Sequence, residues 1–349
     1  MKRVIATALF TVAMIFGGQP VMATTFAVGT CRPKLPSFTT ISAAVAAVPP
    51  GSIVEVCPGI YPEQVTISTP LTLIGGTNGN ADRVTIVVPP SGMIANAGSA
   101  FVFGGSVGAQ VAVTTGPVNI KGITMDGTGV SVGNATFLRL VGVFYGSGSF
   151  GTVDGVTVRN EVFNAQGVGI WAENENGSVL SVTISDSSIY NVGEGIFVGS
   201  DSPNQDELQA KVEFNDIDAA IASIDSDSIG NLLANNVVAF GIADEHESAS
   251  IVGNTVIGGQ VGISSNGAIS SNVLWLVAFT AIAFNGPPLT IKGNRILGAG
   301  TGIDFQCSSS TVTGNFINDV GTGIANVPSS FTLFNNFKNA DTIRTGGCP

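Results

Sequence analysis

The chain has few charged residues, and histidine and tryptophan are scarce. Only 11% of its 349 residues are Asp, Glu, Lys or Arg, and it contains one His and two Trp. Basic residues number 13 against 24 acidic ones. Because nucleic-acid binding needs Lys and Arg to neutralise phosphates, and anionic membrane surfaces attract the same residues, this balance argues against both partners.

Long apolar runs are also missing. The run 4–16 follows Lys2 and Arg3 and precedes Val21-Met22-Ala23. This pattern is typical of a secretory signal peptide, here residues 1–23. That run and the run 273–284 are too short to span a membrane. We expect the mature chain, residues 24–349, to be secreted to the periplasm or the extracellular space with a formal charge of −13.

The four cysteines form no CxxC pair, which disfavours a zinc site. An even count in an exported chain predicts two disulfides, for which three pairings are possible. We expect Cys31–Cys57 and Cys307–Cys348, because the members of each pair lie near the same chain end.

What the chain does have is abundant glycine, 46 residues, and a repeat in its second half. One marker is an isoleucine after Gly or Ala, at Ile170, Ile196, Ile221, Ile242, Ile263, Ile282, Ile303 and Ile324. The second marker is an asparagine in step with it, at Asn215, Asn236, Asn254, Asn272, Asn294, Asn315 and Asn336. A shared period of about 20 residues indicates stacked repeats.

Short alternating segments fill these repeats, such as V-T-I at 65–67, 84–86 and 182–184. Alternation is typical of strands with one buried face, and coils of such strands wind into a parallel β-solenoid. We expect Ile to lie over Ile in the core. We expect Asn to lie over Asn at a turn, where it tolerates left-handed backbone and forms a stack of amides. A leucine-rich repeat is excluded because leucine is sparse and no helix recurs.

One helical pattern precedes the repeats. The apolar residues of 41–48 share a helical face, Thr40 is placed to cap its start, and Pro49-Pro50-Gly51 ends it. A solenoid has open ends that proteins cover. We expect this helix to close the N-terminal end and the segment after Asn336 to close the other.

Residues 38–75 resemble the N-terminal entry of the pectin lyase-like superfamily. The matching parts are the capping helix, Pro-Gly, an apolar strand, P-G-x-Y-x-E, V-x-I and L-T-L-I-G. The resemblance, which the Asn-bearing coils extend over most of 38–340, implies an all-β fold, a single right-handed parallel β-helix. The superfamily includes pectate lyases, pectinesterases, polygalacturonases, alginate epimerases and phage tailspikes. The catalytic motifs of these enzymes are not found. Ile303-Asp304-Phe305 is the segment most similar to the catalytic strand of the pectinesterases, but the paired Asp and the Arg that act with that strand are missing.

Polar residues follow several of the isoleucines, and the single histidine is among them, in A-D-E-H-E-S at 243–248. We expect these residues to form one polar column along the helix. Its members are Glu173, Asp225, Asp227, Asp244, Glu245, Asn266, Asn285, Asp304 and Gln306.

Three interpretations of this column are open. Carboxylates one or two coils apart would lie about 5 or 10 Å from each other, as glycosidase pairs do. The candidate catalytic residues are then Asp225, Asp227, Asp244, Glu245 and His246, with His246 as a general acid or base. The same carboxylates are also the ligands that Ca²⁺ prefers. The interpretation we prefer is a hydrated polar turn without a catalytic role.

The two tryptophans have different predicted places. Trp171 follows Ile170 and is a candidate for sugar stacking if it faces outward, whereas Trp275, within V-L-W-L-V, is expected in the core. We predict a secreted protein that binds a polysaccharide or cell-surface glycan, or that serves as a surface or structural module. A polysaccharide lyase, hydrolase or esterase that uses the acidic column is the alternative.

Overall fold

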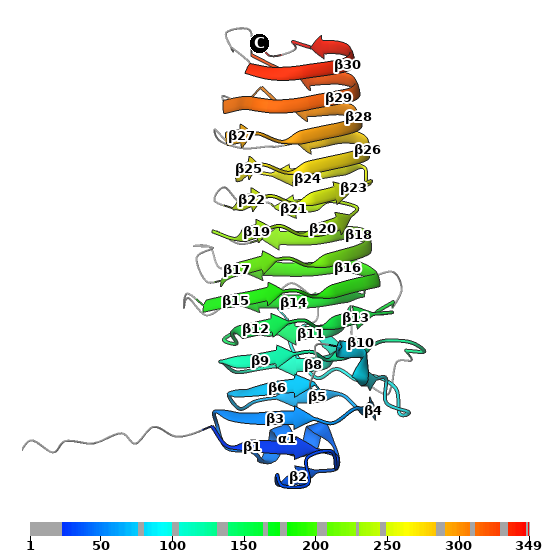
Figure 1. Cartoon of the computed structure of the whole chain (residues 1–349), viewed down its shortest axis with the longest axis vertical. Coiled ribbons are helices and arrows are strands. Elements are labelled where there is room, and N and C mark those ends of the chain that lie inside the picture. The colour runs from blue at the N-terminus through cyan, green and yellow to red at the C-terminus, as the bar shows by residue number, and fades with distance from the viewer. Residues whose placement is uncertain are drawn as a thin grey trace, which may run out of the picture.

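Parallel strands stack into a column of coils that ascends in chain order from β1 (Thr25–Val28) to β30 (Phe334–Arg344), as Figure 1 shows. The computed structural model describes residues 23–75, 80–99, 105–130, 139–162, 167–174, 180–200, 208–227, 230–244, 249–283, 290–307, 311–328, 334–346 and 348. The predicted all-β fold, a single right-handed parallel β-helix, is confirmed.

Each coil contributes to three ladders of parallel strands, here called A, B and C. Ladder A contains β3 (Ser52–Val56), β6 (Leu71–Gly75), β9 (Val118–Lys121), β12 (Gly151–Asp154), β15 (Leu180–Ser185), β17 (Leu208–Glu213), β19 (Leu232–Ala234), β22 (Ser250–Val252), β25 (Ala268–Ser270), β27 (Thr290–Lys292) and the start of β29 (Thr311–Ala325).

Ladder B contains β4 (Gly59–Pro62), β7 (Val84–Val87), β10 (Thr124–Asp126), β13 (Thr157–Arg159), the starts of β16 (Ser188–Ser200) and β18 (Asp216–Asp227), then β20 (Val237–Ala239), β23 (Thr255–Ile257) and the first parts of β26 (Val273–Ala283), β28 (Arg295–Asp304) and β30. Ladder C contains β5 (Val65–Ile67), β8 (Val107–Val113), β11 (Arg139–Tyr145), β14 (Val168–Asn174), β21 (Ile242–Asp244), β24 (Val261–Ser265) and the last parts of the long strands.

The core lies inside the coils and is built by the alternation read from the sequence. Isoleucines pair with isoleucines in register along ladder C, as predicted, with one exception. Ile224 lies between Ile196 and Ile242, whereas Ile221 is 55% exposed at the corner before the strand. The prediction for Ile221 was wrong. Ile221 and Ile224 both follow a small residue, Ala or Ser, and because the corner is longer in this coil, Ile224 takes the core position.

The asparagine stack is present and buried between ladders A and B. In Asn254 the backbone N–H and the side-chain Nδ2 both donate to Oδ1 of Asn272, at 2.8 and 3.0 Å, and Nδ2 also donates to the carbonyl of Leu233 in the preceding coil. The same pattern runs from Asn215 to Asn315. Each amide therefore satisfies an N–H and a carbonyl of the preceding coil, as Asn254 does for Asn236 and Leu233, and donates to the amide of the next coil.

Two predictions about this stack need correction. Its last member is Asn335, which accepts from Asn315, whereas the predicted Asn336 is exposed and pairs with Phe316 on ladder B. The left-handed residue is the one before each Asn, such as Gly253 (φ 70°) or Phe214 (φ 59°), because the chain turns there and the Asn itself is extended into the core.

The helix α1 (Ile41–Ala47) covers the N-terminal end of the column, next to the short strand β2 (Ser37–Phe38). Thr40 caps it as predicted, accepting from the N–H of Ala43. Glu63 from the P-G-x-Y-x-E motif accepts from the N–H groups of Ile41 and Ser42, at 2.9 and 2.8 Å. The motif therefore ties the first coil to the start of α1, whose first N–H groups have no partner within the helix.

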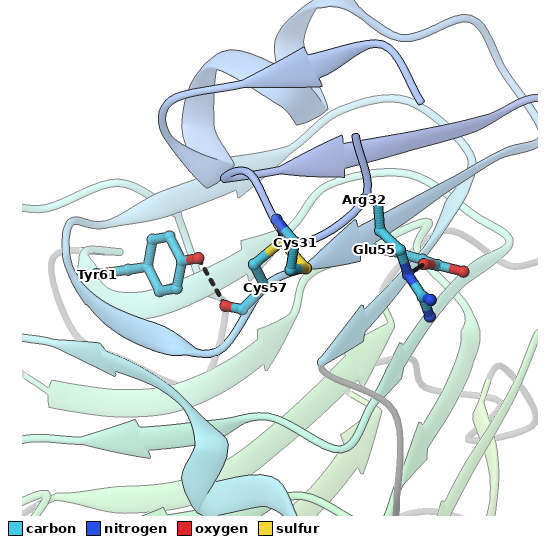
Figure 2. Close-up of a disulfide and its surroundings, with 5 residues drawn as sticks. All are labelled: Cys31, Arg32, Glu55, Cys57 and Tyr61. Atoms are coloured by element: carbon cyan, nitrogen blue, oxygen red, sulfur yellow. Dashed lines mark hydrogen bonds and ion pairs between the residues drawn. A yellow bond between two sulfur atoms is a disulfide. The ribbon is translucent and has the colours of Figure 1, made fainter. Parts of the chain in front are cut away.

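Both disulfides join the expected pairs, Cys31–Cys57 and Cys307–Cys348. Figure 2 shows the first, with the Tyr61 hydroxyl donating to the carbonyl of Cys57 at 2.7 Å beside it. At the other end the segment after Asn336 forms most of β30 and continues the column, while Cys348 ties it to Cys307, which follows β28 two coils earlier. The expected separate closing segment is thus replaced by a further coil.

The predicted signal peptide, residues 1–23, lies outside the described residues except for Ala23, and it stays a prediction. No helix in the described part of the chain has the length and apolar character needed to cross a membrane.

Candidate functional site

Those of the predicted acidic residues that the structure describes do not lie together. Asp225 and Asp244 lie one register position apart on neighbouring strands of ladder C, since Asp225 pairs with Ala243 and Ser226 pairs with Asp244. Successive side chains of a strand point to opposite faces. Asp225 therefore faces outward, and Asp244 faces the interior.

Asp244 is 3% exposed and bridges three coils. Its Oδ1 accepts from the hydroxyl of Ser226 at 3.0 Å and its Oδ2 from the hydroxyl of Ser265 at 2.7 Å. A carboxylate held in this way links neighbouring coils and is covered by them. Glu245 and His246 lie outside the described residues, as does Asn285.

The remaining members of the expected column are dispersed. Asp227 and Glu173 each pair with Gly199 from opposite sides, and Glu173 is buried. Asp304 pairs with Ala283 and Ala325, so no carboxylate lies directly above or below it; Asp225 shares its register four coils away. The prediction of one column was wrong because it assumed that the turn follows the isoleucine after the same number of residues in every coil. Within the described residues, no group of three His, Cys, Asp or Glu side chains is placed to hold a metal ion.

The two tryptophans have exchanged their predicted places. Trp171 is 2% exposed and packs against Phe197, with ring centres 4.8 Å apart, while its Nε1 donates to Glu173 at 3.0 Å. Both ring faces are covered, so Trp171 is not a platform for a sugar. Trp275 is 48% exposed on the outer face of ladder B. Trp171 follows the inward-facing Ile170 and is buried in a second apolar cluster with Val107, Phe144 and Val168, outside the main core, whereas Trp275 stays half-exposed.

A lateral groove runs along the corner between ladders B and C. It consists of three adjoining hollows of 360, 340 and 460 Å³. The first is lined by 127–130, Asn160, Val162 and Asn191, the second by 190–192, 218–220 and Phe240, and the third by 220–222, 240–243, Gln260, Val261 and Ser264. Asn191 belongs to the first and second hollows, and Phe240 belongs to the second and third, so the three are continuous.

Exposed aromatic side chains follow this groove. Tyr190 and Phe240 line it, and Trp275 lies beside it. Ladder B joins them, because Tyr190, Asp218, Ala239, Ile257 and Trp275 pair in sequence. Tyr190 and Trp275 are therefore four coils apart. Phe240 directly follows Ala239, in the coil midway between them. At ~4.8 Å per coil the three rings are spaced by roughly 10 Å along the axis.

A polar cluster closes the first end of the groove. The Arg159 guanidinium donates to Asp126 and to Asp82, each at 2.8 Å, and to the hydroxyl of Tyr190 at 3.1 Å. Asn160 donates to Asp126 at 2.9 Å. The cluster joins four successive coils and fixes the side chains from which the groove starts.

Two carboxyl groups at this corner have opposite pKa shifts. Burial alone would raise the pKa of Asp126, but hydrogen bonds from Asn160, Thr128 and Arg159 lower it to about 2. Burial, and next the charge of Asp126, raise the pKa of Glu161 well above its usual value. Neither carboxyl oxygen of Glu161 has a hydrogen-bond partner in the described part of the chain. Opposite shifts suit an acid and a base, but Glu161 is fully buried, away from any ligand in the groove.

The sequence analysis missed Phe240 and Tyr190. A signal for Phe240 does exist: the residue four positions after a stack asparagine has left-handed backbone in several coils, and glycine occupies it at Gly258 and Gly298. Phe240, at φ 72°, stands four after Asn236. Leu276, at φ 54°, holds the equivalent position four after Asn272, so a bulky residue replaces glycine in two of the described coils. No comparable signal in the sequence marks Tyr190.

A smaller hollow of 180 Å³ lies at the N-terminal end, next to the first disulfide. Arg32 and Glu55 line it and pair with each other at 2.7 Å, as Figure 2 shows. Because its two charges satisfy each other, this hollow offers a ligand less than the lateral groove does.

Comparison with known proteins establishes the fold. The family 28 exopolygalacturonase of Yersinia enterocolitica is 13% identical with a TM-score of 0.53, over 94% of this chain and 79% of that one. A lacto-N-biosidase of Eubacterium ramulus is 12% identical with a TM-score of 0.52, over 93% and 67%. The fold that the chain shares with these structures is a parallel β-helix. No family model and no curated protein matches the sequence.

Proposed function

We propose that the protein binds a glycan chain along the lateral groove. The observation that carries this proposal is the continuity of three hollows with exposed aromatic rings at regular intervals beside them. A fold of this kind supports many functions, so the function has to be argued from the site.

The groove has the two kinds of surface that a sugar ring needs. Pyranose rings have apolar C–H faces and hydroxyl edges, and exposed Tyr, Phe and Trp rings supply flat apolar area at low entropic cost. Amide side chains supply both donors and acceptors for hydroxyl groups. Asn191 and Gln260 are exposed and line the first and third hollows.

Phe240 stands where the fold gains least from it. It is 48% exposed and has a φ of 72°, a conformation that glycine adopts in the next coil at Gly258. An L-residue in this region carries strain of the order of 1 kcal/mol or more, and such strain concentrates at functional sites. An exposed aromatic ring held at a strained corner in the middle of the groove supports a role in binding.

The experiment is affinity electrophoresis of the mature protein, residues 24–349, in gels that contain a panel of plant, algal and bacterial polysaccharides. Isothermal titration with oligosaccharides of a retained polymer then gives the dissociation constant. Phe240→Ala is expected to weaken binding at least tenfold, about 1.4 kcal/mol. A reducing-sugar assay on the same mixtures reports any cleavage.

Phe214→Ala is the matched control. Phe214 is also left-handed, at φ 59°, and 56% exposed, but it lies at the corner between ladders A and B, outside the groove. Its substitution should leave the dissociation constant within about twofold, as expected for a surface change away from the site. Equal effects of the two substitutions, or no polysaccharide retained, would contradict the proposal.

A further inference from the structure

We infer that the glycan is an uncharged polysaccharide, and that the groove rejects polyuronates. This inference rests on the proposed function and adds the chemical class of the ligand. It comes from the distribution of charge along the groove.

The groove offers a polyanion no cationic partner. Of the described residues that line the three hollows, Asp218 alone carries a charged side chain, and it is exposed. The nearest cation at the first end is Arg159, and its guanidinium is already bonded to two carboxylates, Asp126 and Asp82. Recognition of sugar carboxylates ordinarily uses an Arg fork with free donors, and here Nε and Nη1 of Arg159 already donate to Asp126, Asp82 and Tyr190.

Asp218 makes a uronate costly at the centre of the groove. It pairs with Tyr190 and Ala239 on ladder B, which places it between two of the aromatic rings. Like charges repel, and the repulsion is strongest where little water lies between them. A polyuronate would meet this repulsion in any register, since every ring carries a carboxylate.

The same carboxylate suits a neutral sugar. An ionised carboxyl group is only an acceptor, and hydroxyl groups are donors, so Asp218 can hold one or two hydroxyls of a ring stacked on Tyr190. The amides of Asn191 and Gln260 add donors on either side. Much of the remaining lining is apolar, from Ala219 and Ala220 to the larger Ile221 and Val261.

The ligand also has to be a chain. The three aromatic rings lie roughly 10 Å apart along the helix axis, because they occur on every second coil. A single sugar covers one ring at most. An extended polysaccharide parallel to the column would reach all three, and its affinity would rise with length up to the span of the groove.

The test uses one polymer in two charge states. A neutral polysaccharide that the protein retains is oxidised at C6 to graded uronate content, and both forms are titrated at 20 and 300 mM NaCl. We expect the neutral form to bind with an affinity that changes less than twofold with salt. The oxidised form should bind at least tenfold more weakly at 20 mM and partly recover at 300 mM, because salt screens the repulsion.

Variants separate charge from shape. Asp218→Lys should restore binding of the oxidised polymer. Asp216→Lys is the matched control, since Asp216 is exposed on the same strand but does not line the groove; it should leave the oxidised polymer weakly bound. Equal rescue by both substitutions, or oxidised polymer bound as tightly as neutral polymer, would overturn the inference.

The outcomes also distinguish this inference from the proposed function. Alginate or polygalacturonate bound in preference to neutral polymers, with or without Ca²⁺, and weakened by Phe240→Ala would leave the groove as the binding site and overturn its neutral specificity. Retention of neither class of polymer would overturn both.

Discussion

The guanidinium of Arg159 donates a hydrogen bond of 3.1 Å to the hydroxyl of Tyr190. The two residues pair in register on ladder B, and Arg159 also donates to Asp126 through Nε and to Asp82 through Nη1. The polar cluster at the corner therefore fixes the orientation of the first aromatic ring of the groove. A binding surface gains affinity when its ring is held in place before the ligand arrives.

Substitution of Tyr190 tests whether the ring or its hydroxyl matters. Tyr190→Ala should lower glycan affinity about tenfold, because it removes the stacking surface. Tyr190→Phe should lower it less than about threefold, since a half-exposed hydrogen bond contributes only 0.5–1.5 kcal/mol and the ring remains. Isothermal titration of both variants with the same oligosaccharide measures the difference. Similar losses for both would mean that the hydroxyl contacts the sugar directly.

The two tryptophans allow the division between core and surface to be measured. Trp171→Ala should lower the free energy of unfolding by about 3–5 kcal/mol, the usual cost of removing a buried tryptophan. Trp275→Ala should change it by less than about 0.5 kcal/mol and should weaken glycan binding instead. Urea denaturation followed by circular dichroism gives the first quantity, and titration gives the second. A stability loss at Trp275 as large as at Trp171 would contradict the exposed position.

The period and the alternation were enough to predict the fold, because both are set by local chemistry. A strand of the V-T-I type buries every second residue wherever it occurs. The entry motif likewise has a local cause: Glu63 accepts from the first N–H groups of α1. The pairing of the disulfides could be predicted because the coils stack in chain order, which keeps residues near one chain end together.

The site could not be predicted in the same way, because it depends on corner lengths that vary from coil to coil. Ile221 and Ile224 are equally good repeat markers in sequence, and only the register with Ile196 and Ile242 distinguishes them. A shift of one residue moves a side chain to the other face. This is how Asp244 came to the interior and Asp225 to the surface, although the sequence places both soon after an isoleucine.

The buried carboxyl of Glu161 makes stability depend on pH. Its pKa is raised in the folded protein, so the folded state holds the proton more tightly than the unfolded state does. Below the usual value of 4.5 both states are protonated, and no penalty arises. As pH rises above that value, the unfolded state releases the proton first, and stability falls.

Glu161→Gln should therefore raise the melting temperature at pH 8 and leave it nearly unchanged at pH 4. Differential scanning calorimetry across this range measures the difference curve. The control is Asp126→Asn, which acts in the opposite direction: the lowered pKa of Asp126, about 2, means that its stabilisation is present above its usual value of 3.8 and is lost toward pH 2. A Glu161→Gln curve parallel to wild type at all pH values would show that the carboxyl is not buried.

The asparagine stack should be a major contributor to stability, and a neighbouring residue provides its control. Asn254→Ala removes the acceptor for two donors of Asn236 and leaves the carbonyl of Leu233 without its amide donor. Each buried polar group left unsatisfied costs about 1–3 kcal/mol, so the free energy of unfolding should fall by several kcal/mol. Asn336→Ala, at the exposed position that the sequence repeat favoured, should change it by less than about 0.5 kcal/mol. Equal losses in urea denaturation would mean that the stack ends at Asn336, and a negligible loss for Asn254→Ala would mean that water replaces the amide.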